Sequence, residues 1–227
     1  MTRQIPLDLQ TPPALTRGDF LLADANRDAL AMLDAPDRWP QGRLLLIGPD
    51  GSGKSHIAAF RAAECGAPIV DAAALEGRSP GDLLSTGALV IDNADQAAGH
   101  PAREAALFHL WNLTPARGSL LLTARSAPRD WGLTLPDLRS RMDAMTQVRL
   151  GAPDEELLAA VLVKLCADRQ LVVPPALIGW LVRRMDRDLG MARRLVVALD
   201  AAALAAGGPV TRRMAADLLD KIAVSGA

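Results

Sequence analysis

The chain has 227 residues, half of them hydrophobic, and its 25 lysines and arginines against 26 aspartates and glutamates leave a formal charge of −1. This length suits one large or two small domains, and the balanced charge gives no global sign of nucleic-acid binding while leaving room for a local basic patch. Cys65 and Cys166 match no metal-binding spacing and indicate a reducing compartment. With no signal-peptide pattern and no apolar run long enough to span a membrane, we expect a cytoplasmic protein.

The first half of the chain alternates short apolar runs with helical patterns. Residues 1–13 hold three prolines and too few apolar side chains to fold alone, so we expect a tail there. Asp24 or Asn26 can cap a helix that follows at residues 27–33. Strands are then predicted at residues 44–47, 68–71, 88–92, 119–123 and 147–150, with helices at residues 56–63 and 103–113. The alternation predicts an α/β fold, with a five-stranded parallel sheet covered on both faces.

After Leu150 no further strand is predicted, and four helical patterns follow at residues 154–169, 175–185, 188–206 and 211–222. Pro153 is well placed near the start of the first, and Thr211 is a candidate cap for the last. We therefore expect a tail at residues 1–13, a three-layer αβα core at 14–151 and a small all-α lid domain at 152–227.

One stretch fits the phosphate-loop pattern G-x-x-x-x-G-K-[ST] at every fixed position, between a predicted strand and a predicted helix. Its glycines allow backbone N–H groups to surround phosphates at the helix N-terminus. Lys54 is expected to reach the terminal phosphates, and the Ser55 hydroxyl is expected to bind Mg²⁺. The motif predicts binding of a nucleoside di- or triphosphate by Gly48, Pro49, Asp50, Gly51, Ser52, Gly53, Lys54 and Ser55.

Polar residues end two of the predicted strands. Asp92 follows an apolar strand, where a carboxylate of a phosphate-loop protein holds Mg²⁺. The next residue is Asn93, whose amide cannot act as a general base, and Asp95 stands at the wrong spacing for that role. We therefore expect tight nucleotide binding with weak intrinsic hydrolysis. Thr123 ends another strand and is a candidate neighbour of the terminal phosphate, although an ordinary polar residue at a sheet edge explains it equally well.

Arginines supply the remaining candidates. Arg141 can be a surface arginine, or an arginine finger that enters another subunit's nucleotide site and stabilises the transferred phosphoryl group. In the helical part, Arg187, Arg193 and Arg194 lie where a helix can return over the nucleotide, and an ordinary charged helix face is the alternative.

Together these motifs resemble the AAA+ ATPases of the bacterial replication-initiator group, over roughly residues 18–223. Leu138-Arg139-Ser140-Arg141-Met142 is similar to the arginine-finger box of that group, and residues 48–56 and 91–92 to its Walker motifs. The resemblance implies a Rossmann-like ASCE core with a helical lid. It also implies a lid sensor arginine, Arg187 or Arg193, and an adenine-side motif, made by Phe20, Leu21, Leu22 and Asn26, with His56 following the Walker A run.

Two departures make the chain resemble the Hda family, which inactivates the initiator DnaA. The chain ends at Ala227, so we expect it to lack the initiator's helix-turn-helix DNA-binding domain, and the initiator's acid pair is Asp92-Asn93 here. The N-terminal run 4–9 also resembles the clamp-binding peptide of that family. An extended peptide places alternate side chains in pockets, so the expected clamp-binding residues are Gln4, Ile5, Leu7 and Leu9.

The resemblance implies a regulator that docks on the β sliding clamp of DNA polymerase III and uses Arg141 to stimulate hydrolysis of DnaA-bound ATP. Its expected cofactors are ADP or ATP with Mg²⁺, and we expect neither sequence-specific DNA binding nor membrane contact. A self-acting AAA+ ATPase, such as a helicase loader binding single-stranded DNA, is the alternative, which Asn93 and the balanced charge disfavour. A metabolic phosphate-loop kinase would need a substrate lid with paired charged groups near the loop, and the sequence shows none. The sequence leaves open whether the chain forms a homodimer or a higher assembly.

Overall fold

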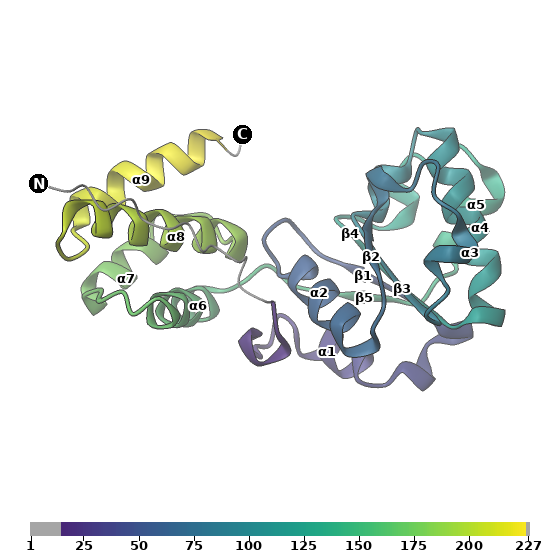
Figure 1. Ribbon diagram of the computed structural model, residues 1–227, viewed down its shortest axis with the longest axis horizontal. Coiled ribbons are helices and arrows are strands. Elements are labelled where there is room, and N and C mark those ends of the chain that lie inside the picture. Colours follow the sequence, from purple (N-terminus) through teal and green to yellow (C-terminus); the bar gives the residue numbers. More distant parts are fainter. Residues whose placement is uncertain (1–14, 226–227) are drawn as a thin grey trace, which may run out of the picture.

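The computed structural model describes residues 15–225, apart from the side chains of residues 115–117 and 223–225. The chain forms an α/β part built around a sheet and, beside it, a bundle of helices (Figure 1). The four predicted clamp-binding residues Gln4, Ile5, Leu7 and Leu9 lie outside the described residues. Within the described range, no helix is long and apolar enough to cross a lipid bilayer.

The sheet has five parallel strands in the order β2-β3-β4-β1-β5, which confirms the predicted fold class. Because Leu46 pairs with Thr123 and Ile91 pairs with Leu122, the ends of the three central strands come to one edge of the sheet. That edge carries the loop after Ile47. The strands are β1 (Arg43–Ile47), β2 (Ile69–Asp71), β3 (Ala88–Asp92), β4 (Ser119–Ala124) and β5 (Gln147–Arg149).

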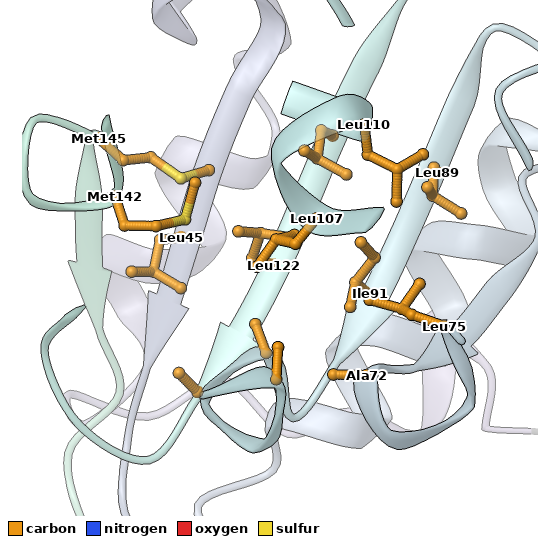
Figure 2. Close-up of a cluster of buried hydrophobic side chains, with 14 of the residues drawn as sticks. Leu45, Ala72, Leu75, Leu89, Ile91, Leu107, Leu110, Leu122, Met142 and Met145 are labelled. Carbon is orange, nitrogen blue, oxygen red and sulfur yellow. The ribbon is translucent and has the colours of Figure 1, made fainter. Parts of the chain in front are cut away.

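Successive residues of a strand point to opposite faces, and both faces of this sheet are buried. In β1, Leu44 and Leu46 pack on one face with α1 (Arg27–Leu33) and α2 (Lys54–Cys65). Leu45 and Ile47 pack on the other face, which is covered by α3 (Pro80–Leu83), α4 (Pro101–Arg117) and α5 (Pro136–Asp143). Figure 2 shows this second cluster, with α4 side chains Leu107 and Leu110 lying over the strands. Burial on both faces explains why the strands read as unbroken apolar runs.

The helical part has its own hydrophobic core, made by α6 (Glu155–Asp168), α7 (Pro175–Val182), α8 (Leu189–Ala206) and α9 (Arg212–Ser225). Side-chain caps fix where three of these helices begin. The Asp154 carboxylate accepts the Leu157 N–H at 2.7 Å and the Asp188 carboxylate accepts the Met191 N–H at 2.9 Å. The Thr211 hydroxyl accepts the Met214 N–H at 3.2 Å, so the predicted cap of the last helix is confirmed.

Helix α3, of only 4 residues, was not predicted, and three further local features differ from the prediction. Asn26 precedes α1 but its side chain does not cap the helix; its amide instead accepts the Ala23 N–H at 3.0 Å and donates to the Leu21 carbonyl at 2.9 Å. The helix predicted at 175–185 ends at Val182. Helix α5 was not predicted, because it is only 8 residues long and buries only Leu138 and Met142.

Candidate functional site

The phosphate loop joins β1 to α2 and contains two glycines in left-handed backbone conformations. Gly51 has φ 71° and Gly53 has φ 97°, values that side chains disfavour. Gly53 stands immediately before α2. The first N–H groups of α2, which have no partner within a helix, therefore face the loop and form a favourable place for an anion.

Lys54 closes this loop. Its side chain is only 6% exposed, and its ammonium donates to the carbonyls of Gly48 and Pro49 at 2.8 Å each. Burial lowers the pKa of Lys54, against the opposing effect of Asp50 and other nearby carboxylates. The ammonium is thus a desolvated cation held by neutral groups, which phosphate oxygens can replace as stronger acceptors.

Asp92, Asn93 and Thr123 meet at the edge of the sheet beside the loop. The Thr123 side chain is fully buried, and its hydroxyl donates to Asp92 Oδ1 while its Oγ1 accepts the Asn93 N–H at 3.0 Å. Thr123 therefore fixes one oxygen of the Asp92 carboxylate and the start of the following turn. The structure gives Thr123 the role of positioning Asp92, an alternative that the sequence had not suggested.

Asn93 has a left-handed backbone, with φ 54°, and its Nδ2 donates to the Asp71 carboxylate at 2.7 Å. The amide is thereby tied to β2, and amides cannot accept a proton from water. Asp95 lies two residues further on, and its Oδ1 is buried without a hydrogen-bond partner in the described part of the chain. A carboxylate is therefore present near Lys54, at a different position from Asn93.

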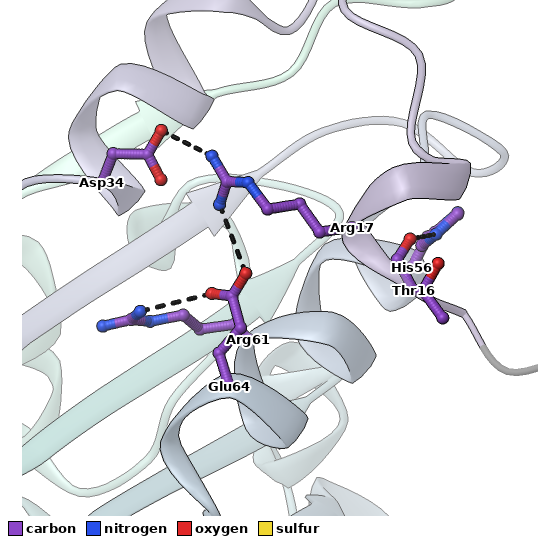
Figure 3. A network of polar contacts seen from close by, with 6 residues as sticks. All are labelled: Thr16, Arg17, Asp34, His56, Arg61 and Glu64. Atoms are coloured by element: carbon purple, nitrogen blue, oxygen red, sulfur yellow. Dashed lines mark hydrogen bonds and ion pairs between the residues drawn. The ribbon is translucent and has the colours of Figure 1, made fainter.

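The segment at residues 16–20, which leads into the α/β part, packs beside the phosphate loop and against α2. Phe20 makes edge contacts with the rings of His56 and Phe60, at centroid distances of 5.3 and 5.8 Å. His56 Nε2 lies 2.9 Å from the Thr16 carbonyl, and burial lowers the pKa of the imidazole. Arg17 anchors the same segment, because its guanidinium pairs with Asp34 at 2.6 Å and with Glu64 at 3.5 Å (Figure 3).

The lid closes over this region at two points. The Leu189 N–H, at the start of α8, donates to the Gly51 carbonyl at 2.9 Å. Lys164 of α6 pairs with Asp19 at 2.7 Å, and chiefly because of this hydrogen bond the pKa of Asp19 falls to about 2. A cavity of about 910 Å³ lies between the lid and the loop. It is large enough for a nucleotide, since small-molecule sites measure roughly 300–1,000 Å³.

Many of the predicted site residues line this cavity, namely Phe20, Leu21, Asn26, Asp50, Gly51, Gly53, Lys54, Ser55, His56, Asn93 and Arg193. Others lie behind it or apart from it. Ser52 is buried in the loop and its Oγ has no hydrogen-bond partner among the described residues, while Leu22 is 64% exposed. Arg187 lies outside the lining and pairs with Glu155 at 3.3 Å, so Arg193 is the better placed of the two candidate lid arginines.

Six charged residues near the site were not among the predicted site residues. Arg125 pairs with Asp50 at 3.1 Å, and the other five line the cavity, namely Asp19, Lys164, Asp168, Arg169 and Asp188. The local sequence around Lys164 indicates only a solvated helix face, and its position over the loop depends on how α6 packs. Arg125 follows β4 by one residue, so its place at the carboxyl edge of the sheet is a signal that could have identified it.

Arg141 lies away from this cavity. Burial and the nearby charge of Arg141 lower the pKa of Arg43, the first residue of β1, whereas the phosphate loop follows the last residue. The Arg141 guanidinium stacks on Phe108 at 4.5 Å and bonds the Asn112 side-chain oxygen. Arg141 therefore cannot serve the chain's own phosphate loop from this position.

The residues present fit a Mg²⁺–nucleotide. Mg²⁺ is usually held by one or two protein oxygens together with phosphate oxygens and water. Ser55 and Asp92 supply a hydroxyl and a carboxylate next to the loop, and Thr123 engages one oxygen of Asp92. Among the described residues, no group of three His, Cys, Asp or Glu side chains could hold a metal alone. A metal at this site would therefore depend on the phosphates of the nucleotide.

The fold is that of an AAA+ domain and is similar to the replication initiator DnaA. Domain III of Thermotoga maritima DnaA matches 92% of this chain and 97% of its own length, with a TM-score of 0.77 and 19% identity. A DnaA bound to AMPPCP and single-stranded DNA matches 86% of this chain and 68% of its own, with a TM-score of 0.68 and 16% identity.

A related fold occurs in the FIGL-1 AAA domain in complex with ADP, with a TM-score of 0.63 and 16% identity over 88% of this chain and 83% of that one. No protein-family model matches the chain. At these identities the similarity establishes a DnaA-like AAA+ fold, and the activity has to be inferred from the site.

Proposed function

We propose that this chain is a nucleotide-bound AAA+ regulator of the replication initiator DnaA, which stimulates hydrolysis of DnaA-bound ATP through Arg141. The observation that carries the proposal is the separation of Arg141 from the chain's own phosphate loop, toward opposite ends of β1. A guanidinium in that place is positioned to serve another molecule's nucleotide.

The contacts of Arg141 support this role. Phe108 and Asn112 are both neutral, and within the described residues Arg141 forms no ion pair. An aromatic ring and an amide orient the guanidinium without neutralising it. Its charge therefore stays available for a partner's phosphates, where an arginine finger contributes roughly 10³–10⁵ in rate.

The chain's own nucleotide then has a structural role. In this proposal ADP or ATP with Mg²⁺ occupies the cavity, Lys54 contacts the phosphates, and Arg193 approaches from the lid. Asn93 supplies an amide where hydrolytic relatives place an acid, which favours slow turnover. The nucleotide holds the core and the lid in one arrangement instead of being consumed.

The proposal includes docking on the β sliding clamp through the peptide at residues 4–9, with Gln4, Ile5, Leu7 and Leu9 as anchors. The deletion of residues 1–10 should leave a folded protein that binds nucleotide but no longer co-elutes with the clamp of the same organism. Co-elution of the truncated protein would refute this part of the proposal alone.

The central experiment measures hydrolysis of ATP preloaded on DnaA, with DNA-loaded clamp and this chain present. Arg141→Ala should remove the stimulation while nucleotide binding stays unchanged. Arg139→Ala is the matched control, because Arg139 is an exposed arginine on the same helix. Stimulation by the Arg141→Ala protein at the wild-type level would refute the assignment.

A self-acting ATPase, such as a helicase loader that binds single-stranded DNA, is the second candidate. The buried, unpartnered Oδ1 of Asp95 favours it, since a carboxylate near Lys54 can activate water. This candidate requires steady-state turnover by the chain alone, stimulated by single-stranded DNA and lost in Asp95→Asn. Slow turnover that responds neither to single-stranded DNA nor to Asp95→Asn would exclude the self-acting ATPase and leave the regulator as the proposed function.

A further inference from the structure

The lid carries a cluster of arginines that the proposed function does not use. Each of the four is exposed, and none lines the nucleotide cavity. In the described part of the chain, none of them forms an ion pair with a carboxylate. We call this cluster the lid arginine patch, and it consists of Arg183, Arg184, Arg212 and Arg213.

Trp180 of α7 organises the patch. The guanidinium carbon of Arg184 lies 4.8 Å from the centre of the Trp180 ring, and that of Arg212 lies 5.0 Å from it. The start of α9, which carries Arg212, lies at the end of the bundle away from the sheet (Figure 1). Arg183 and Arg213 are the immediate chain neighbours of Arg184 and Arg212 and are exposed as well.

The contacts of Arg184 and Arg212 with Trp180 join α7 to α9, but the helix ends do not account for all four charges. Arg183 and Arg184 follow the C-terminal end of α7, where cations are favourable, but Arg212 and Arg213 begin α9, where a cation opposes the helix macrodipole. Arg184 and Arg212 also lie within about 10 Å of each other, since each is about 5 Å from one ring, so they repel. An anionic partner removes this repulsion.

We propose that the lid arginine patch binds the phosphate backbone of duplex DNA without reading its bases. Guanidinium groups donate paired hydrogen bonds to phosphate oxygens. Successive phosphates of one strand rise about 3.4 Å each along the duplex axis, so two guanidinium groups at most about 10 Å apart can reach nearby phosphates of the same strand. Single strands are bound through aromatic rings on which bases stack, whereas here two guanidinium groups already engage the Trp180 ring.

This surface lies apart from Arg141 and from the cavity, so it can be tested independently of the proposed function. The measurement is fluorescence anisotropy of a short labelled duplex titrated with the full chain at several salt concentrations. Arg184→Glu/Arg212→Glu should weaken binding at least about tenfold. Arg38→Glu/Arg129→Glu is the control, because it changes two exposed arginines of the α/β part by the same charge and should keep affinity within about threefold.

A milder variant protects the test against misfolding. Arg184→Gln/Arg212→Gln should retain the wild-type melting temperature and reduce the slope of log affinity against log salt by about 2. Equal losses in the Arg184→Glu/Arg212→Glu protein and its control would reveal a net-charge effect and overturn the proposal. Absence of duplex binding at low salt, or tighter binding of a single strand than of the duplex, would overturn it as well.

Discussion

Lys54 and Arg141 lie toward opposite ends of β1 and are held in different ways. Lys54 is buried, and two backbone carbonyls hold its ammonium inside the loop. Arg141 is held by a ring and an amide on the outer surface of α5 and α4. A buried cation bound by weak acceptors is suited to receive an anion in the same chain, and an oriented surface cation is suited to meet one from another chain. On the proposed function, nucleotide binding belongs to one end of the sheet and action on a partner to the other.

The largest expected effect on nucleotide affinity follows from removing the Lys54 side chain, which leaves the Arg141 end of the sheet unchanged. Lys54→Ala should weaken ADP binding about 100-fold, because a hydrogen bond to a charged group contributes about 1.5–3 kcal/mol. Isothermal titration calorimetry measures the affinity, and Arg78→Ala, at an exposed arginine away from the cavity, is the control. An affinity unchanged in Lys54→Ala would mean that the nucleotide does not use this loop.

Glu104 holds the chain just before α5, the helix that carries Arg141. Its carboxylate is 1% exposed and accepts N–H groups of Gly99, Thr134 and Leu135, just before α5 begins. Although burial raises the pKa of Glu104, these hydrogen bonds lower it below the usual value. Glu104→Gln should cost about 2–4 kcal/mol of unfolding free energy in urea.

The pH dependence of Glu104 gives a second readout. Because its pKa is lowered on folding, its stabilising effect is complete above the unfolded pKa of about 4.3 and is lost as pH falls through the folded value. Wild type should therefore lose more stability in acid than Glu104→Gln does, and Glu76→Gln, at an exposed position, should behave as wild type. Parallel acid curves for wild type and Glu104→Gln would contradict this account.

A substitution of Thr123 tests whether the nucleotide end of the sheet binds Mg²⁺ through Asp92. Thr123→Val keeps the buried volume but leaves Asp92 without the hydroxyl that orients it. The Mg²⁺-dependent part of nucleotide affinity should fall by about 1.5–3 kcal/mol, while affinity measured in EDTA should stay the same. Thr86→Val is the control, since the Thr86 hydroxyl bonds only a nearby carbonyl in the described structure. Equal losses with and without Mg²⁺ would show that Thr123 does not act through the metal.

The smallest expected effect concerns the contact between core and lid. Asp19→Asn removes the ion pair with Lys164, whose partners are both partly exposed, so nucleotide affinity should fall only about twofold. Since the pKa of Asp19 is lowered to about 2, the wild-type advantage should persist above pH 4 and disappear as pH falls toward 2. Lid opening measured by hydrogen exchange should rise in Asp19→Asn at neutral pH and approach the wild-type value as pH falls toward 2.

The sequence predicted those parts of the molecule that depend on local patterns. Each strand was found because burial on both faces produces runs such as Leu44 to Ile47, and the phosphate loop was found because its glycines and Lys54 have fixed spacing. Helix α5 was missed because two buried residues in 8 give little periodicity. The lid residues Lys164 and Arg169 were missed because their role depends on how α6 docks over the core, which no local pattern encodes.

The contact between Gly51 and the lid has a mechanical consequence. A Cβ at Gly51 would lie 2.2 Å from Asp188 Oδ1 and 2.5 Å from the Asp188 Cα, so a methyl group there would act as a wedge under α8. The glycine of the loop is therefore required by the lid as well as by the phosphates. A ligand that binds the loop more tightly while Leu189 is bonded to Gly51 would therefore also stabilise the contact between lid and core.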